Sequence, residues 1–186
     1  TVKRNLSNVR AIWNYMAIEH GIETVSPFAN MNYGNAKAPV KRLTIPIVDI
    51  HKVQKLCLEL DDDIRWIIAA ISDSGMRLAE VIGLTASDVH LDEKAPFVRL
   101  SEHSSRRLKT AESEREVPLV GATLWGLERA IECSDGGLLF PRYCTPEGNE
   151  ANYASSALNK WLRSYVPDGC VVHSFRHSVR DRLRAV

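Results

Sequence analysis

Three side chains suited to phosphate chemistry stand out in the sequence. His173 and Arg176 are three positions apart, a spacing that places two side chains on one face of a helix. Imidazole exchanges protons near neutral pH, and a guanidinium offers a planar fork of donors that matches a phosphate. A second arginine, Arg77, lies 99 residues before Arg176 and closely follows a Ser74-Gly75 turn, where a helix should begin. The pattern predicts a phosphate site if folding brings these segments together.

The composition excludes several other classes of protein. Hydrophobic residues make up 45% of the 186 positions and charged residues 25%, which does not fit a disordered or collagen-like chain. No apolar run approaches the roughly 20 residues that cross a bilayer, and no signal peptide is evident, so we expect no membrane partner. The four cysteines contain no Cys-x-x-Cys pair, which predicts reduced thiols in the cytoplasm and no metal site.

Basic residues gather at the two ends of the chain. The net charge is only +1, which does not indicate a generic nucleic-acid binder. However, residues 1 to 42 carry six basic against two acidic side chains, and residues 170 to 186 carry four against one. A further cluster contains Arg106, Arg107 and Lys109. If folding places these segments on one face, that face would attract a polyanion.

Hydrophobic periodicity predicts a mainly α fold with a small antiparallel β-sheet, the α+β class. Apolar residues recur at helical spacing in segments 2–19, 53–60, 64–71, 78–82, 124–131, 158–165 and 175–183. Asp62 or Asp63 is expected to cap the third helix, and the last helix is expected to bury Phe175, Val179 and Leu183. Segments 97–100, 106–109 and 115–119 are predicted as short strands, with residues 110–114 as the hairpin turn.

A polar segment at residues 27 to 42 divides the chain. It contains prolines, asparagines and a glycine together with Lys37, Lys41 and Arg42, a composition typical of an interdomain linker. Residues 1 to 26 would then be the last helix of an upstream domain. Residues 43 to 186 would form a second domain, long enough to bury a core of its own.

Several motifs, in their order along the chain, resemble the catalytic domain of the tyrosine recombinase (phage integrase) family. They are residues 74–84 around Arg77, Lys109 before Arg-Glu-Val-Pro-Leu at 115–119, Leu-Leu-Phe-Pro at 138–141, and residues 173–177. The match covers residues 43 to 186, and the preceding helix and linker resemble the end of that family's core-binding domain. The resemblance implies a site-specific recombinase that cleaves and rejoins double-stranded DNA through a 3′-phosphotyrosyl intermediate, without a metal or small-molecule cofactor.

The resemblance also implies roles for individual residues. Arg77 and Arg176 would neutralise charge on the pentacoordinate phosphorus. Lys109 would protonate the leaving 5′ oxygen, and His173 would act as acid or base near the attacking oxygen. Glu80, one helical turn beyond Arg77, would orient the arginine or the lysine. Contacts to DNA are expected from Arg42, Arg106, Arg107, His177 and Arg180. The family assembles as tetramers on DNA, which implies other protomers as partners and a nucleoid-associated location in a prokaryotic or phage setting.

The nucleophilic tyrosine of the family has no counterpart in the sequence. In the family it follows the second arginine beyond a further helix, whereas Tyr143, Tyr153 and Tyr165 all precede His173. Because the covalent step needs that tyrosine, we expect a C-terminally truncated piece of a recombinase that binds DNA and cleaves nothing.

Simpler interpretations remain open. Arg77 and Glu80 would also fit a surface ion pair, Lys109 a solvated hairpin charge, and Arg176 and Arg180 the solvent-exposed face of the last helix. At the level of the whole chain, the alternatives are a non-catalytic DNA-binding module with the recombinase fold and a helical protein-interaction domain. A recombinase and a DNA-binding module both predict a DNA affinity that falls with added salt, whereas a protein-interaction domain predicts none.

Overall fold

The computed structural model describes residues 2–23, 25–31, 43–103, 106, 113–145 and 148–185. The chain divides into two compact units, Thr1–Lys41 and Arg42–Val186. In the first unit, helix α1 (Val2–Glu19) occupies the segment predicted to be helical. The finer division, with residues 1–26 belonging to an upstream domain and 27–42 serving as a linker, stays a prediction. Among the described residues, no helix combines the length and apolar character needed to cross a bilayer.

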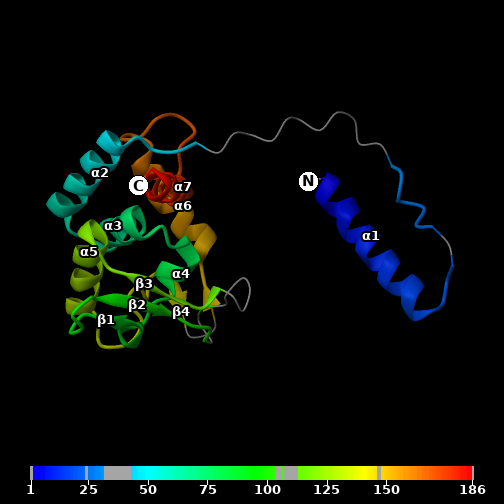
Figure 1. Ribbon diagram of the computed structural model, residues 1–186, viewed down its shortest axis with the longest axis horizontal. Helices are drawn as coiled ribbons and strands as arrows, with labels where there is room; N and C mark the ends of the chain where they lie inside the picture. Colours follow the sequence, from blue (N-terminus) through cyan, green and yellow to red (C-terminus); the bar gives the residue numbers. More distant parts are fainter. Residues whose placement is uncertain are drawn as a thin grey trace. The chain divides into compact units, whose positions relative to one another are not determined.

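Helix α3 (Asp63–Ser74) forms the centre of the second unit (Figure 1). It contacts α2 (Ile47–Leu60), α4 (Leu78–Ile82), α5 (Gly121–Glu132), α6 (Ala151–Leu162) and α7 (Val172–Arg184). Partners on several sides explain why residues 67 to 72 are all buried, and why residues 67 to 71 are apolar without a break instead of forming a stripe. Asp62 caps this helix, as predicted, because its side chain accepts a hydrogen bond from the Arg65 N–H at 3.1 Å.

A three-stranded antiparallel sheet packs against the helices in the order β1 (Val89–His90), β2 (Phe97–Leu100) and β3 (Arg115–Pro118). Val98 and Leu100 of β2 are buried, whereas Arg99 between them is exposed and pairs with Glu116 across the sheet. This alternation follows from the two-residue period of a strand, which places one face of the sheet on the core. The predicted strands at 97–100 and 115–119 are confirmed to within one residue.

Other parts of the predicted sheet have different outcomes. Residues 107 to 112 lie outside the described residues, so most of the predicted strand 106–109 and of the turn 110–114 stays a prediction. Strand β1 was not predicted, because two residues are too few to show an alternation. A small hairpin, β4 (Cys144–Thr145) with β5 (Gly148–Asn149), was not predicted either, since its strands are equally short. The mainly helical α+β class is confirmed.

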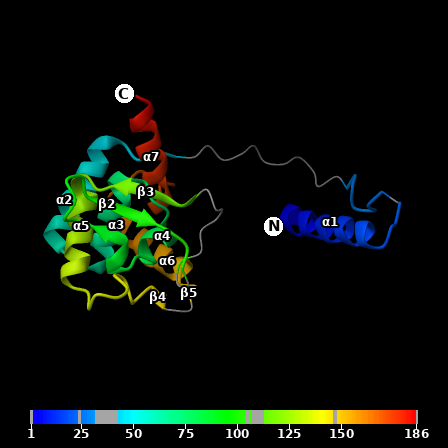
Figure 2. The ribbon, with the colours of Figure 1, turned by 60° about the horizontal axis from the view of Figure 1, so that its bottom comes forward.

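Helix α7 closes the domain by reaching back to its first residues. Ser178 Oγ accepts a hydrogen bond from the Ile45 N–H at 2.8 Å, across 133 positions of sequence. Phe175 is fully buried in the core, as predicted. The prediction for Leu183 is wrong: its side chain is 74% exposed, because the last turn of α7 projects beyond the body of the domain (Figure 2). The apolar spacing of the helix continues after the core has ended.

Candidate phosphate-binding site

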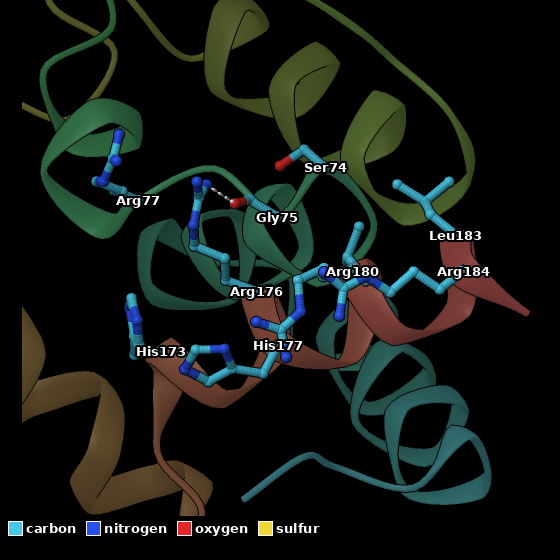
Figure 3. A pocket seen from close by; sticks show the side chains of 10 residues that line it. Ser74, Gly75, Arg77, His173, Arg176, His177, Arg180, Leu183 and Arg184 are labelled. Carbon is cyan, nitrogen blue, oxygen red and sulfur yellow. Dashed lines mark hydrogen bonds between the residues drawn. The ribbon is translucent and has the colours of Figure 1, made fainter. Parts of the chain in front are cut away.

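The turn between α3 and α4 and one face of α7 line a pocket of about 570 Å³. The pocket brings together Arg77, His173 and Arg176, the three side chains that the sequence singled out, and also His177 and Arg180 (Figure 3). Arg77 comes from the start of α4, whereas the other four project from successive turns of α7. Residues 99 positions apart in sequence therefore share one cationic pocket.

Arg77 is held by a carboxylate one helical turn further along. It is the N-cap residue of α4, and its N–H donates to Glu80 Oε2 at 2.8 Å while its Nη1 donates to Oε1 at 2.5 Å. A glutamate at the third helical position commonly satisfies the N-cap N–H in this way. Glu80 is only 3% exposed, whereas the Arg77 side chain, which lines the pocket, is 35% exposed. The simpler interpretation of a solvated surface pair does not fit this burial.

Glu80 has a second cationic partner that the sequence did not reveal. Arg115, the first residue of β3, donates from Nη2 to Glu80 Oε2 at 2.9 Å and from Nη1 to the Ser113 carbonyl at 2.9 Å. Burial raises the pKa of Glu80, but the hydrogen bonds from Arg115 and Arg77 outweigh it and hold the pKa below its ordinary value. The carboxylate is thus ionised between two guanidinium groups.

Arg176 is positioned by the glycine that ends α3. Its Nη1 donates to the Gly75 carbonyl at 2.5 Å (Figure 3). Gly75 has φ +63°, a left-handed conformation that ends helices and that glycine adopts without strain. A Cβ at this position would lie 3.2 Å from Val179 of α7, so the absence of a side chain also lets α7 approach. Burial and repulsion from Arg77 lower the pKa of Arg176, though a guanidinium remains charged.

Two histidines occupy the wall formed by α7. His173 is exposed to the pocket, while His177, one turn later, is 8% exposed. Their rings meet edge to face, with centroids 4.9 Å apart and planes at 82°. Arg180, on the next turn, is exposed and pairs with Asp181 at 3.1 Å. His177 and Arg180, both predicted to contact DNA, therefore line the same pocket as Arg77 and Arg176.

The structure speaks against one predicted DNA contact, that of Arg106. This side chain has no exposed surface and forms a bidentate ion pair with Asp88, at 2.9 and 3.0 Å. Its remaining donors reach the carbonyls of Ser101 and Gly83. A guanidinium with every donor direction satisfied inside the protein cannot bind a phosphate without leaving this network. The three remaining predicted residues lie outside the described part of the chain: Arg42, Arg107 and Lys109.

Neither a metal-binding cluster nor a tyrosine accompanies the pocket among the described residues. No group of three His, Cys, Asp or Glu side chains within them is placed to hold a metal ion. No tyrosine of the described residues lines the pocket. Tyr143 is fully buried, and the Tyr165 ring packs at a tilt of 47° against Trp161, with centroids 4.8 Å apart. What the pocket offers is therefore positive charge, hydrogen-bond donors and imidazole.

Comparison with known proteins adds information at the level of the fold. No protein-family model matches the sequence, and no curated protein is similar to it. Solved structures of the Tn1549 transposon integrase do match. One, in complex with circular intermediate DNA, has a TM-score of 0.67 at 15% identity, and the match covers 99% of this chain and 66% of that one. Another, of a variant with transposon right end DNA, has a TM-score of 0.61 at 16% identity with the same coverage.

This chain spans slightly less than two thirds of the length of the integrase structures. At such low sequence identity the similarity is one of fold. It confirms the fold expected from the motifs around Arg77 and Arg176: the chain is built like the Tn1549 integrase, on the tyrosine recombinase catalytic-domain fold.

Proposed function

We propose that residues 43 to 186 are the DNA-binding catalytic domain of a tyrosine-type site-specific recombinase. The observation that carries the proposal is the convergence of Arg77, His173 and Arg176 in one pocket, on a fold shared with the Tn1549 integrase, which was solved bound to DNA. The partner is double-stranded DNA, and other protomers of the same protein would assemble with it on that DNA.

The pocket fits a phosphodiester in the act of exchanging one ester oxygen for another. In this reaction a tyrosine oxygen attacks phosphorus, the bond to the 5′ oxygen breaks, and the leaving oxygen takes up a proton. Arg77 and Arg176 would stabilise the added negative charge on the non-bridging oxygens, because fixed guanidinium donors cost little reorganisation. His173 would exchange a proton near the attacking oxygen, and Lys109 would protonate the 5′ oxygen.

The 186-residue chain is expected to bind phosphate without cleaving DNA. No tyrosine of the described residues lines the pocket, so the group that would form the covalent link is missing from it. A nicked DNA substrate that traps covalent intermediates tests this expectation. A protein–DNA adduct that survives denaturation would contradict it.

DNA binding by arginine variants tests the site. Arg77→Gln and Arg176→Gln are each expected to weaken binding of a short DNA duplex by on the order of tenfold. Each should also reduce the slope of log affinity against log salt by about 0.9, because one fewer phosphate is neutralised. Arg163→Gln is the matched control, since Arg163 is exposed at the end of α6, outside this pocket. Equal effects of all three substitutions would refute the site, and salt-independent binding would favour the protein-interaction alternative.

A non-catalytic DNA-binding module is the second candidate, favoured by a pocket lining in which the described residues include no tyrosine. Vanadate separates the two, because it adopts the five-coordinate geometry of the reacting phosphorus. A catalytic pocket binds transition-state analogues about 10² times more tightly than ground-state ligands, or better. Vanadate should therefore displace DNA at far lower concentration than inorganic phosphate does. Equal potency of the two anions would favour the non-catalytic module.

A further inference from the structure

Glu80 holds two guanidinium groups at once, and this affects the charge that Arg77 can offer. Arg77 Nη1 lies 2.5 Å from Oε1, while Arg115 Nη2 lies 2.9 Å from Oε2 and its Nη1 lies 3.4 Å from Oε1. The Glu80 side chain is 5% exposed, so water screens these interactions little. The cluster of one carboxylate and two guanidiniums carries a net charge of +1.

Without Arg115, the same carboxylate would neutralise Arg77. A neutral pair attracts a phosphate far less than a cation does, so the pocket would lose the charge of Arg77 and keep those of the arginines on α7. With Arg115 in place, the carboxylate still holds the Arg77 guanidinium through Oε1 and the Arg77 N–H through Oε2. The orientation is kept and the positive charge is restored.

Arg115 is itself held firmly enough to act in this way. It lies opposite Leu100 in the β2–β3 register, and its Nη1 donates to the Ser113 carbonyl at 2.9 Å. It contacts Glu80 from the sheet and is not among the side chains that line the pocket. Its influence on a phosphate would therefore pass through Glu80 and Arg77 rather than through direct contact.

We propose that Arg115 is a positioning residue for phosphate recognition: it shares Glu80 with Arg77, offsets the carboxylate charge and leaves the Arg77 guanidinium free to bind phosphate. This proposal rests on the proposed function, since it takes Arg77 as a phosphate contact. It goes beyond that function by giving a role to a side chain that does not line the pocket.

A double-mutant cycle tests the proposal with a short fluorescein-labelled DNA duplex between about 50 and 200 mM NaCl. Arg115→Gln is expected to weaken binding severalfold and to lower the salt slope by up to about 0.9, because Glu80 then neutralises Arg77. In an Arg77→Gln background, Arg115→Gln should lower the salt slope no further, because no Arg77 guanidinium is left for Glu80 to neutralise. The Glu80 carboxylate, then without a cation, repels DNA, so affinity falls somewhat without a change in the salt slope. The matched control is Arg99→Gln, which removes the same charge from the neighbouring strand, where Arg99 pairs with exposed Glu116. Its effect on the salt slope should be negligible.

The possible results separate the two proposals. If Arg77→Gln leaves DNA binding unchanged, the proposed phosphate site fails. If Arg77→Gln weakens binding but Arg115→Gln behaves like Arg99→Gln, only the role of Arg115 fails. If the losses of the Arg77 and Arg115 variants multiply and the salt slope falls by about 1.8 in the double variant, Arg115 contacts phosphate directly and the positioning role is overturned.

A conservative variant keeps the test independent of folding. Arg115→Lys retains a cation beside Glu80 and is expected to keep the salt slope of the native chain, with a small loss of affinity from the missing fork geometry. Circular dichroism at the binding temperature verifies that each variant is folded. A salt slope for folded Arg115→Lys as low as that of Arg115→Gln would overturn the charge argument.

Discussion

Replacing Arg106 with leucine is expected to destabilise the second unit strongly while leaving phosphate recognition intact. Arg106 has no exposed surface and donates to both Asp88 carboxylate oxygens. In the variant, Asp88 stays buried at 8% exposure and, among the described residues, retains the hydrogen bonds from the Thr85 N–H and hydroxyl, both at 2.9 Å, with His103 Nε2 3.7 Å away. The buried carboxylate would thus lose its guanidinium partner.

The cost follows from this geometry. Breaking a buried ion pair by removing one partner costs about 3–5 kcal/mol, because the remaining charge is left uncompensated. The two hydrogen bonds from Thr85 place the expected value for Arg106→Leu near the lower end, about 3 kcal/mol. For a domain of this size, a loss of about 3 kcal/mol lowers the thermal midpoint by roughly 6–12 °C.

Urea and thermal unfolding followed by circular dichroism measure this loss. Arg99→Leu is the control, because its pair with Glu116 is more than half exposed on both sides and should be worth at most about 1 kcal/mol. Adding Asp88→Asn to Arg106→Leu removes the orphaned charge and should recover part of the stability. A loss below about 1 kcal/mol for Arg106→Leu, or no recovery in the double variant, would refute the reasoning.

Acidification gives an independent check on the same pair. Burial raises the pKa of Asp88, but the hydrogen bonds from Arg106 and Thr85 outweigh it, so the pKa lies below the ordinary 3.8. The stability from the pair is therefore complete above about pH 4 and is lost as the pH falls through the lowered pKa. In Arg106→Leu, burial dominates and raises the pKa of Asp88. The difference in stability between native chain and variant should thus narrow as the pH falls, and a constant difference would contradict the assignment.

Three further outcomes are expected. Gly75→Ala should cost about 1–2 kcal/mol in urea unfolding, and more than Gly136→Ala, because both glycines have positive φ but only at Gly75 would the new Cβ meet α7. Glu80→Gln should make the free energy of unfolding depend less on pH in the acid range. Burial raises the pKa of Glu80, but the two arginines lower it by more. The stability that Glu80 contributes is therefore complete above about pH 4.5 and is lost as the pH falls through the lowered pKa. In thiol labelling at pH 8, exposed Cys133 should react fast. Burial raises the pKa of Cys57 to about 12, so Cys57 should react only in denaturant. Fast labelling of Cys57 in the native chain would contradict this expectation.

Much of the fold and the site was predictable because the relevant signals are local. The helix over residues 2 to 19, the cap at Asp62 and the turn at Gly75 each depend on a few neighbouring residues. Arg77 and Arg176 were found through residue type and the expected start of a helix. Their convergence in one pocket was an expectation from the resemblance, and the structure places them there.

The features that sequence reasoning missed depend on contacts between distant elements. Arg115 reaches Glu80 across 35 positions, from a strand to a helix, and no spacing rule connects the two. Arg106 belongs to a basic cluster that would normally be solvated, and only the buried carboxylate of Asp88 explains its place in the interior. Leu183 fits the apolar stripe of its helix, but a stripe does not reveal where the core ends.

The placement of α7 has a consequence for the order in which the domain is built. One wall of the pocket comes from the end of α3 and the start of α4, and the other wall comes from α7. The hydrogen bond between Arg176 and Gly75 closes a loop of 101 positions, and the one between Ser178 and Ile45 closes a loop of 133 positions. Closing such loops costs entropy that only the packing of the core around Phe175 can offset. A partly synthesised chain that has not yet released α7 therefore has no pocket, so the proposed phosphate site cannot form until α7 has left the ribosome.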